Sequence, residues 1–415
     1  MRILHVTQRY PPAVGGAETW CAGLARWQAS QGHDVRVLTL RAVQDDELWG
    51  DVEPLPAPVG VGIADDDRGV RVRRCAPARF GFTGSNLLGR LKLSSWTCSH
   101  SPEMYGLLPR AARWADVVHA HTVPAAHIFA AWVAARLTRR PYVLTPHFHE
   151  GEPVHEQPPV RWLLRHADRV VVDTATEAVL LAARGVDPQR ITPATIAVDP
   201  AVLGSAAGSR AVVRAALGID SDVPLVCFVG RKQSNKGIEV LLAALPHVRH
   251  RPRPIIALAG PTTGWYRQLP RPEQSIVRVL DLPMLSEWAK ADLLGASDLL
   301  VLPSRAEAFG IVFLEAWAVG IPVIGAAIPA VCEALGDAGI TFRPDDPVSL
   351  AAAIDDVLAN PGAARERTAR GRRRILESHT WERVGRAVAQ AYERALVERG
   401  PRAARALLTP SERTP

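Results

Sequence analysis

Cysteine is scarce in this sequence, with five residues among 415. They stand far apart and no two form a Cys-x-x-Cys pair; the positions are Cys21, Cys75, Cys98, Cys227 and Cys332. The odd number and the wide spacing exclude a small disulfide-bonded scaffold and give no zinc-ribbon pattern. We therefore expect the chain to work in a reducing compartment, the cytoplasm.

Long apolar runs are also absent. The longest stretch without a charged residue, residues 316–332, is interrupted by Gly320, Pro322 and Pro329. It predicts a buried helix, a turn and a strand rather than a membrane span, which needs about 20 apolar residues. The first six residues lack the longer apolar core and the small-residue cleavage site of a secretory signal.

The composition, with 47% hydrophobic and 22% charged residues, is that of a globular protein, and the length suits two domains. Short apolar runs predict buried parallel strands at Ile3–Val6, Val35–Leu40, Val117–His119, Tyr142–Thr145, Val170–Val172, Leu225–Val229, Ile255–Ala259, Ile276–Leu280, Leu299–Leu302 and Pro322–Ile324. Helical patterns lie between them. The alternation predicts an α/β fold of two doubly wound, Rossmann-like domains facing each other across a cleft.

Ligands of such folds bind beyond the carboxyl ends of the strands, and three motifs lie there. Gly15-Gly16-Ala17-Glu18 follows the first strand and precedes a helix, so its N–H groups can approach an anion, although a plain tight turn explains it equally well. Gly230, Arg231 and Lys236 follow the strand Leu225–Val229 and suit a diphosphate. The alternative is two surface cations in a loop.

The third motif runs from Pro303 to Ala316, where a strand leads through a loop into a helix. The loop and the helix N-terminus offer N–H groups to a leaving phosphate. Glu307 and Glu315 flank this seat, and carboxylates there suit sugar hydroxyls, one on a hexose and one on a ribose. Either glutamate alone is also explained as a partner of the helix dipole.

Four histidines lie near strand ends: His119, His121, His147 and His149. They allow a metal site, but we favour one or two of them as hydrogen-bonding partners of a substrate. Residues 45–69 read as a loop, and Asp65-Asp66-Asp67 within it as a solvated acidic run.

Positive charge is unevenly distributed in a chain of net charge +7. Residues 68–102 hold seven basic and no acidic residues, mixed with apolar side chains such as Phe80, Leu91 and Trp96. This mixture predicts a contact with an anionic acceptor or a peripheral contact with an anionic membrane. The second basic run, residues 365–374, is better explained as a solvated helix face, so we expect no nucleic-acid partner.

Together these motifs resemble the retaining glycosyltransferases of family 4, the group 1 glycosyl transferases with GT-B architecture. The resemblance covers nearly the whole chain and rests on Gly15–Glu18, His119, Thr145–His147, Phe228–Arg231, Lys236–Gly237, Glu307–Ile311, Glu315–Ala316, Gly320–Val323, Gly336–Gly339 and Trp381. It implies an acceptor-binding domain at 1–200, a linker at 201–222, a nucleotide-sugar-binding domain at 223–378, a helix at 379–400 that crosses back, and a tail.

The resemblance also implies roles for individual residues. Arg231 and Lys236 would hold the diphosphate, Glu307 the donor sugar and Glu315 the ribose. The backbone of Phe309, Gly310 and Ile311 would contact sugar and phosphate, with Gly230 allowing close approach. His147 would lie beside the reacting carbon, Gly15 and Gly16 under the phosphate or the acceptor, and the nucleobase near residues 281–285.

The implied reaction is transfer of a hexose-type sugar from a nucleotide-diphosphate sugar to a hydroxyl of a glycan, glycolipid or small molecule. The leaving phosphate takes the acceptor's proton on the same face, so the configuration is retained, without a cofactor or a metal. Two alternatives stay open. One is a nucleotide-sugar epimerase of the same architecture, and the other is a non-catalytic protein that binds nucleotide sugars.

Overall fold

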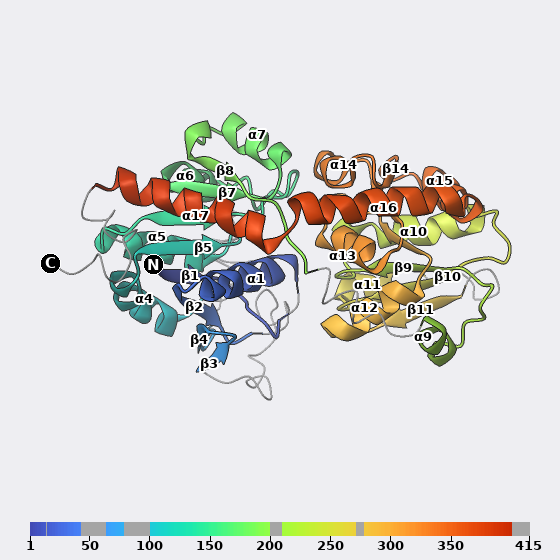
Figure 1. The fold of residues 1–415 in the computed structure, drawn as a ribbon, viewed down its shortest axis with the longest axis horizontal. Helices are drawn as coiled ribbons and strands as arrows, with labels where there is room; N and C mark the ends of the chain where they lie inside the picture. The colour runs from blue at the N-terminus through green and yellow to red at the C-terminus, as the bar shows by residue number, and fades with distance from the viewer. Residues whose placement is uncertain (14, 43–63, 79–99, 200–209, 271–277, 401–415) are drawn as a thin grey trace. The chain divides into compact units, whose positions relative to one another are not determined.

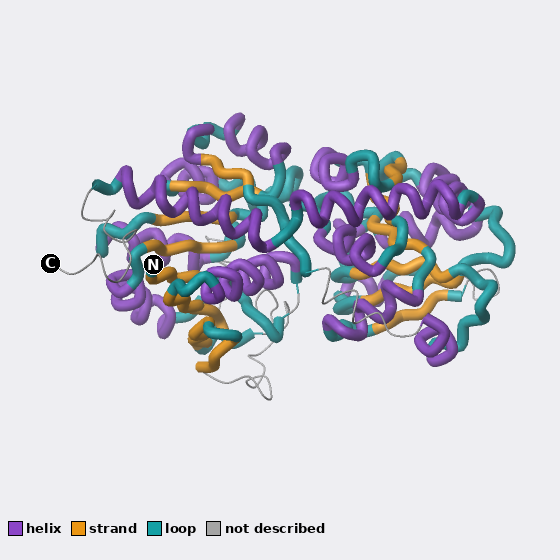
Figure 2. The backbone as a smooth tube through the Cα atoms, viewed as in Figure 1, coloured by secondary structure: helices purple, strands orange, loops and turns teal. Residues whose placement is uncertain are grey.

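The computed structural model describes residues 1–13, 15–42, 64–78, 100–199, 210–270 and 278–400. The chain forms two compact units. Unit 1 contains Met1–Thr195 and the chain from Trp381 onward, and unit 2 contains Ile196–Thr380. Each unit consists of a central sheet with helices against it, seen as orange strands among purple helices in Figure 2.

The unit 1 sheet has the strand order β3-β4-β2-β1-β5-β6-β7-β8. Its strands are β1 (Arg2–Val6), β2 (Asp34–Leu40), β3 (Ala64–Asp67), β4 (Val70–Cys75), β5 (Val117–His121), β6 (Tyr142–Thr145), β7 (Arg169–Val172) and β8 (Ile191–Pro193). Every pairing is parallel except that of β3 with β4. The strand order reverses between β1 and β5, so a ligand is expected beyond the carboxyl ends of these two strands.

The helices of unit 1 are α1 (Gly16–Ser30), α4 (Pro102–Trp114), α5 (Ala126–Leu137), α6 (Pro158–His166), α7 (Ala175–Ala183), the short η2 (Pro188–Arg190) and the C-terminal α17 (Trp381–Glu398). Helix α17 is joined to α1 by reciprocal contacts of tryptophan with glycine. A Cβ atom at Gly23 would lie 1.9 Å from the Trp381 ring, and one at Gly385 would lie 2.1 Å from the Trp27 ring. Only glycine allows this close approach of the two helices.

The unit 2 sheet is parallel in all its described pairings, in the order β11-β10-β9-β12-β13-β14. The strands are β9 (Leu225–Val229), β10 (Ile255–Ala259), β11 (Val279–Leu282), β12 (Leu299–Leu302), β13 (Val323–Ala326) and β14 (Ile340–Phe342). The order reverses between β9 and β12, which therefore mark the expected ligand position in this unit.

The helices of unit 2 are α9 (Arg210–Ala216), η3 (Ser234–Lys236), α10 (Ile238–Ala244), η4 (Leu245–His247), α11 (Gly264–Gln268), α12 (Glu287–Ala296), α13 (Ile311–Val319), α14 (Pro329–Leu335), α15 (Pro347–Ala359) and α16 (Pro361–Ser378). Helix α16 contains the second basic run, and it buries Ala364, Thr368, Gly371 and Ile375 while its arginines lie on the other faces. A Cβ atom at Gly371 would lie 2.3 Å from the Trp317 ring of α13.

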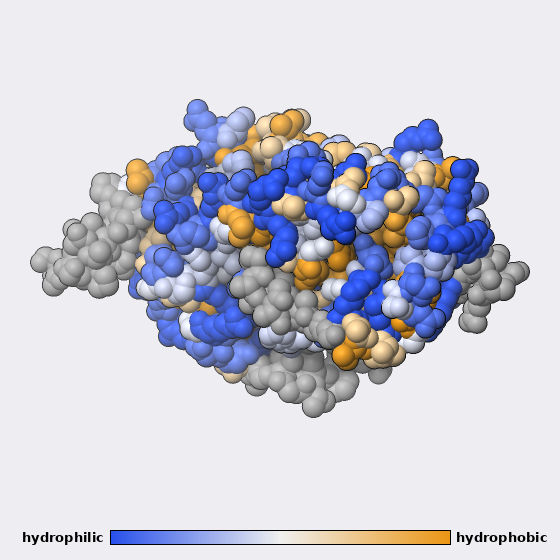
Figure 3. All heavy atoms as spheres, turned by 45° about the vertical axis from the view of Figure 1, so that its right-hand side comes forward, coloured by the Kyte–Doolittle hydropathy of each residue, from blue (hydrophilic) through white to orange (hydrophobic). Residues whose placement is uncertain are grey.

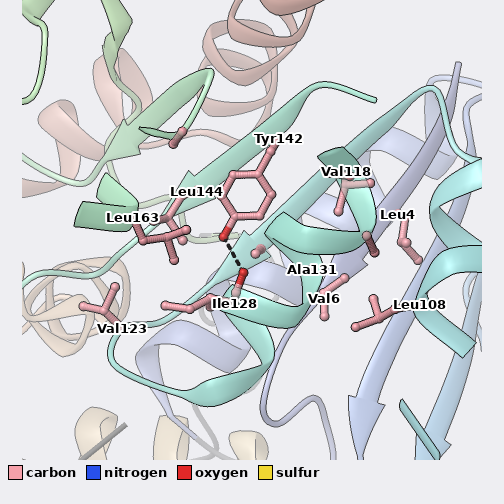
Figure 4. Close-up of a cluster of buried hydrophobic side chains, with 14 of the residues drawn as sticks. Leu4, Val6, Leu108, Val118, Val123, Ile128, Ala131, Tyr142, Leu144 and Leu163 are labelled. Atoms are coloured by element: carbon pink, nitrogen blue, oxygen red, sulfur yellow. Dashed lines mark hydrogen bonds between the residues drawn. The ribbon is translucent and has the colours of Figure 1, made fainter. Parts of the chain in front are cut away.

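The core of unit 1 shows how the apolar runs become buried strands (Figure 4). Val118 of β5 and Leu144 of β6 pack against Ile128 and Ala131 of α5, and all four are fully buried. The Tyr142 hydroxyl donates a 2.9 Å hydrogen bond to the Ile128 carbonyl, so the one polar group of this buried side chain has a hydrogen-bond partner. Full burial of each such large apolar side chain contributes about 1.5–3 kcal/mol.

The predicted α/β alternation is confirmed, but the loop prediction for residues 45–69 is wrong at its end. Ala64–Asp67 forms the edge strand β3. Arginines pair with two of its three aspartates, Arg74 with Asp65 and Arg26 with Asp67, so these two carboxylates are neutralised rather than simply solvated. The strand predicted at Ile276–Leu280 begins at Val279 among the described residues. Residues 316–332 contain the end of α13 and the strand β13, as expected, and also the start of α14, which was not predicted.

Candidate active site

The predicted donor motif of unit 2 is formed by two loops that contact each other, one after β9 and one after β12. Gly237 has φ 65°, and a Cβ atom there would lie 2.1 Å from the Pro303 carbonyl oxygen. Arg305 extends the contact, because its N–H donates to the Asn235 carbonyl at 2.8 Å and its Nη1 to the Ser234 carbonyl at 2.6 Å. The close approach brings the predicted cation of the first loop to the predicted carboxylate of the second.

Lys236 and Glu307 form the central ion pair of this motif. The Lys236 Nζ lies 2.6 Å from Glu307 Oε1, and the Ser304 hydroxyl donates to the same oxygen at 2.8 Å. Both side chains are largely buried. Because both contacts fall on Oε1, the second oxygen can accept a ligand hydroxyl, and the other N–H groups of the lysine can bind an anion.

Glu315 is held in a similar way by a lysine that the sequence analysis did not identify. Lys290 of α12 places Nζ 2.7 Å from Glu315 Oε1 and 3.0 Å from Glu287 Oε2. Burial lowers the pKa of Lys290, but the charges of Glu315 and Glu287 outweigh burial and the pKa lies above its usual value. The lysine therefore stays charged, and it compensates the charge of the buried Glu315. Nothing in the spacing of α12 marks Lys290 in the sequence.

Gly310 is the N-cap of α13, in the left-handed conformation with φ 88°, and it gives that helix no side-chain cap. The first N–H groups of Ile311 and Val312 therefore belong to a helix N-terminus that suits an anion. Phe309 is buried against His379, with ring centroids 5.3 Å apart. The structure thus places Phe309, Gly310 and Ile311 directly after the loop that carries Glu307.

Gly230 and Arg231 lie directly after β9, as predicted. Gly230 N–H donates to the Ala259 carbonyl at 2.9 Å, and a Cβ atom at Gly260 would lie 2.0 Å from the Gly230 carbonyl oxygen. The predicted nucleobase region begins in β11, where buried Lys232 binds Asp281 and donates to the Leu282 carbonyl at 2.6 Å. The lysine fixes this strand end beside the β9 loop.

In unit 1, His147 follows β6 and is buried with φ 48°, a conformation rarely adopted outside glycine. Its Nδ1 lies 2.7 Å from Asp173 Oδ2, and its ring lies edge-on to Trp20 with centroids 5.6 Å apart. The Nε2 atom is buried, with no hydrogen-bond partner among the residues that the structure describes. Asp173 was missed by the sequence analysis, although it directly follows the predicted strand Val170–Val172.

Gly15 precedes α1 and Gly16 is its first residue. The Glu18 carboxylate folds back over Gly15, where a Cβ atom would lie 2.1 Å from Oε2. Arg9 neutralises this carboxylate, with Nη2 2.6 Å from Oε1. The glycine loop therefore carries a buried ion pair at the helix N-terminus, and the predicted contact with phosphate or acceptor stays a prediction.

The other predicted histidines have hydrogen-bond partners of their own. His119 and His121 are fully buried in the sheet, where His119 contacts Tyr392 and Thr145 at 2.7 Å each. His149 instead donates its backbone N–H to His155 Nδ1 at 2.9 Å.

His121 belongs to a second buried group, which includes His5. His5 Nε2 donates to Gln28 Oε1 at 2.7 Å, so its Nδ1 accepts from His121 Nε2 at 2.9 Å. Within the described ranges, His5, Cys21 and His121 are the group whose ligand atoms lie close enough for a metal ion. Burial raises the pKa of the Cys21 thiol, and the two imidazoles already bond each other and Gln28. The absence of a metal from the reaction stays a prediction.

The basic stretch is only partly described, since residues 79–99, with Lys92 and the apolar side chains, lie outside the described residues. In the described part, Arg71 pairs with Asp34, Arg73 with Glu103 and Arg74 with Asp65. These three arginines are thus partners of this chain's own carboxylates, which favours the structural explanation for this part of the stretch.

Comparison with known proteins identifies the family. Residues 223–360 match the family model described as glycosyl transferases group 1, and residues 15–195 match that of the glycosyl transferase 4-like domain. A glycogen synthase of Mycobacterium tuberculosis is 31% identical over 420 residues, with 94% of each chain covered. This chain is a group 1 glycosyltransferase. A D-inositol 3-phosphate glycosyltransferase of Kineococcus radiotolerans is 30% identical to this chain, and the match covers 93% of this chain and 92% of the Kineococcus protein.

Solved structures confirm the GT-B fold of the transferase. HepE of Anabaena in complex with UDP and glucose superposes with a TM-score of 0.70 at 19% identity, over 94% of this chain and 98% of that one. Sucrose-phosphate synthase of Thermosynechococcus elongatus gives a TM-score of 0.73 at 21% identity, over 96% and 99%.

The surface of the transferase is mainly hydrophilic on the face shown in Figure 3, where hydrophobic residues form small separate groups. Among the described residues, no helix combines the length and the apolar character that a membrane crossing requires.

Proposed function

We propose that this transferase moves a hexose-type sugar from a nucleotide-diphosphate sugar to a hydroxyl acceptor, with retention of configuration. The observation that carries the proposal is the pairing of Lys236 with Glu307 beside the start of α13. One small region of unit 2 thus offers a cation, an uncapped helix N-terminus and a carboxylate oxygen that can accept a hydroxyl. These are the groups that a diphosphate joined to a sugar requires.

The proposed reaction proceeds on one face of the sugar. The glycosidic bond stretches, negative charge grows on the diphosphate, and Arg231, Lys236 and the N-terminus of α13 stabilise it. The leaving phosphate oxygen takes the acceptor's proton as the new bond forms on the same side. Glu307 is proposed to bind sugar hydroxyls through its second carboxylate oxygen, because its Oε1 already accepts from Lys236 and Ser304.

Glu315 is the proposed ligand of the ribose. Its Oε1 is neutralised by Lys290, which reduces the repulsion between the carboxylate and a nearby diphosphate. His147 is proposed to contact the donor sugar, while Gly15 and Gly16 contribute to the phosphate or acceptor contact. These assignments come from the resemblance.

UDP-glucose is the first donor to test, because HepE of Anabaena has also been crystallised in complex with this sugar nucleotide. The acceptor is proposed only as a hydroxyl compound, since the relatives differ in the products that their names state. We also propose that the enzyme is cytoplasmic. The buried free thiols of Cys21, Cys75 and Cys227 are typical of a reducing compartment. A peripheral contact with anionic lipid remains part of the proposal.

A thermal-shift panel of sugar nucleotides tests the donor proposal. A sugar nucleotide present at a concentration of 100 times its dissociation constant should stabilise the protein by about 2.7 kcal/mol. The bound sugar nucleotide is then incubated with and without hydroxyl acceptors. A change in the sugar with donor alone would identify an epimerase, and binding without any turnover would identify a non-catalytic binding protein.

Metal independence is tested in the same assay. Transfer should continue in EDTA, because cations of the protein and a helix N-terminus are proposed to meet the charge of the leaving diphosphate. Activity that EDTA abolishes and a divalent ion restores would contradict this part of the proposal.

A further inference from the structure

Two carboxylates surround His147 in a way that the proposed function does not require by itself. Strands β6 and β7 are parallel neighbours, so the residues that follow them lie side by side. His147 comes shortly after β6 and Asp173 directly after β7. The 2.7 Å contact between His147 Nδ1 and Asp173 Oδ2 joins the two strand ends. The side chain of Asp173 is fully buried and that of His147 is 7% exposed.

Glu177 joins the same strand ends through their backbones. Its Oε1 accepts from the Phe148 N–H at 2.8 Å, and its Oε2 accepts from the Asp173 N–H at 2.7 Å. Thr174 and Glu177 have the spacing of a helix capping box, and the Thr174 hydroxyl does accept from the Glu177 N–H at 3.0 Å. The glutamate carboxylate, however, binds the residues next to His147 and Thr174.

These contacts hold a strained residue in place. A positive φ at a non-glycine residue costs on the order of 1 kcal/mol or more, so the neighbours must fix it. The Glu177 carboxylate fixes the peptide that follows His147, and Asp173 fixes the ring. Because Nδ1 faces Asp173, the opposite ring nitrogen, Nε2, is the one left for a ligand, and it is buried without a partner within the described part of the chain.

We propose that Asp173 and Glu177 are positioning residues, which together fix His147 as a charged donor of its Nε2–H to an oxygen of the substrate. The inference rests on the proposed function for the identity of that substrate. Asp173 supplies the negative charge and sets the tautomer, since its oxygen accepts from Nδ1–H. Glu177 sets the backbone conformation that carries the ring.

The electrostatics agree with this geometry. Burial lowers the pKa of His147, but the charge and the hydrogen bond of Asp173, together with the charges of Glu177 and Glu18, outweigh burial, so the pKa lies above its usual value. Burial and the charge of Asp173 raise the pKa of Glu177. The titratable groups facing His147 are Asp173, Glu177, Glu18, His119, His121 and His155.

The first experiment observes the His147 imidazole directly, by NMR with ¹⁵N-labelled histidine and without any substrate. Asp173→Asn should lower the His147 pKa by about one unit or more, because the charged partner is lost. Asp173→Glu should restore part of the shift. Asp168→Asn is the matched control: Asp168 precedes the same strand β7 but binds Arg136, Arg399 and the Tyr142 N–H, and it should leave the His147 pKa unchanged.

The second experiment measures transfer from UDP-glucose against pH. Asp173→Asn should reduce kcat about tenfold or more at pH 7.5 and less at pH 6, while the thermal shift caused by UDP stays that of the parent. Glu177→Gln should reduce kcat several-fold with a smaller change in the pH profile. The glutamine side chain keeps one oxygen that can accept a backbone N–H, and it replaces the second oxygen with an NH₂ group that cannot.

A folded Asp173→Asn protein with the parent's His147 pKa and the parent's pH profile would overturn the inference. If no sugar nucleotide supports transfer, the proposed function fails, but the NMR titration still decides whether Asp173 sets the charge of His147.

Discussion

The two units place different chemistry at the carboxyl ends of similar sheets. In unit 2, the loops after β9 and β12 carry the pair of Lys236 with Glu307, and helices α12 and α13 carry the pair of Lys290 with Glu315. In unit 1, the strand ends carry neutral histidines deep in the sheet, with His147 beside Asp173 as the exception. The comparison indicates that unit 2 holds its buried carboxylates in ion pairs with lysine, whereas unit 1 mainly holds its buried histidines in hydrogen bonds.

Acidification should destabilise unit 1 at a higher pH than unit 2, and this is the largest effect we expect. Burial lowers the pKa of His5, His127 and His155 in unit 1 to about 4. These folded values lie below the unfolded value of about 6.5. Below pH 6.5 the unfolded chain therefore binds protons that the folded protein does not. The free energy of unfolding falls as the pH falls toward 4, by about 3 kcal/mol for each histidine at pH 4.

Hydrogen exchange measured by mass spectrometry between pH 7 and pH 4.5 checks this prediction. Among the described residues of unit 2, His379 is the one with such a lowered pKa, again about 4 and caused by burial. Peptides of unit 1 should lose protection at a higher pH than those of unit 2. Loss of protection in both units at one pH would contradict the expected difference.

Breaking the Lys290 pair should have the next largest effect, a loss of stability in unit 2. Lys290→Met leaves Glu315 buried without its cation, and such a change typically costs 3–5 kcal/mol. Urea unfolding followed by fluorescence gives the free energy of unfolding. The double variant with Glu315→Gln should recover most of the loss, because no uncompensated charge remains. A single variant as stable as the parent would show that the pair contributes nothing to the fold.

Removing the cations of the donor motif should act on turnover. Lys236→Ala and Arg231→Ala should each lower kcat on the order of a hundredfold, since each proposed contact strengthens as the diphosphate leaves. The matched control is Arg343→Ala in the same unit, because Arg343 pairs with Asp346 at the surface and its side chain is 81% exposed. Normal turnover of a folded Lys236 and Arg231 double variant would exclude the assignment.

The glycine contacts offer a smaller test that applies to both units. Gly385→Ala in unit 1 and Gly371→Ala in unit 2 each place a methyl group on a tryptophan ring, and such overpacking costs about 1–3 kcal/mol. Gly106→Ala is the control, since this α4 glycine has nothing within 4 Å of its missing Cβ and alanine favours a helix by about 0.5–1 kcal/mol. The midpoint of thermal unfolding should therefore fall in the Gly385→Ala and Gly371→Ala variants and rise in the Gly106→Ala variant.

The sequence predicted the parallel strands well, because a strand buried on both faces is a continuous apolar run. Strand β4 was missed, since Val70–Cys75 alternates valine with arginine and was interpreted as part of a basic patch. Strand β3 was missed because aspartate disfavours strands, and its partners Arg74 and Arg26 are visible only in the fold.

The donor loops of the candidate site were predictable, because their cation, glycines and carboxylates are close in sequence to strand ends. Lys290 and Glu177 were not, since one lies inside a helix and the other has the spacing of an ordinary cap. Their significance depends on contacts with Glu315 and Phe148, which lie 25 and 29 residues away. No local pattern carries that information.

The position of α17 has a consequence for the order in which the protein is made. Unit 1 obtains Tyr392, Trp381 and Gly385 from α17, yet the whole of unit 2 precedes that helix in the chain. A ribosome must therefore complete residues 196–380 before unit 1 can close its core. Until then, Trp27 and Gly23 of α1 lack their contacts with Gly385 and Trp381. Unit 2, although its synthesis begins later, is therefore the first unit that can finish folding.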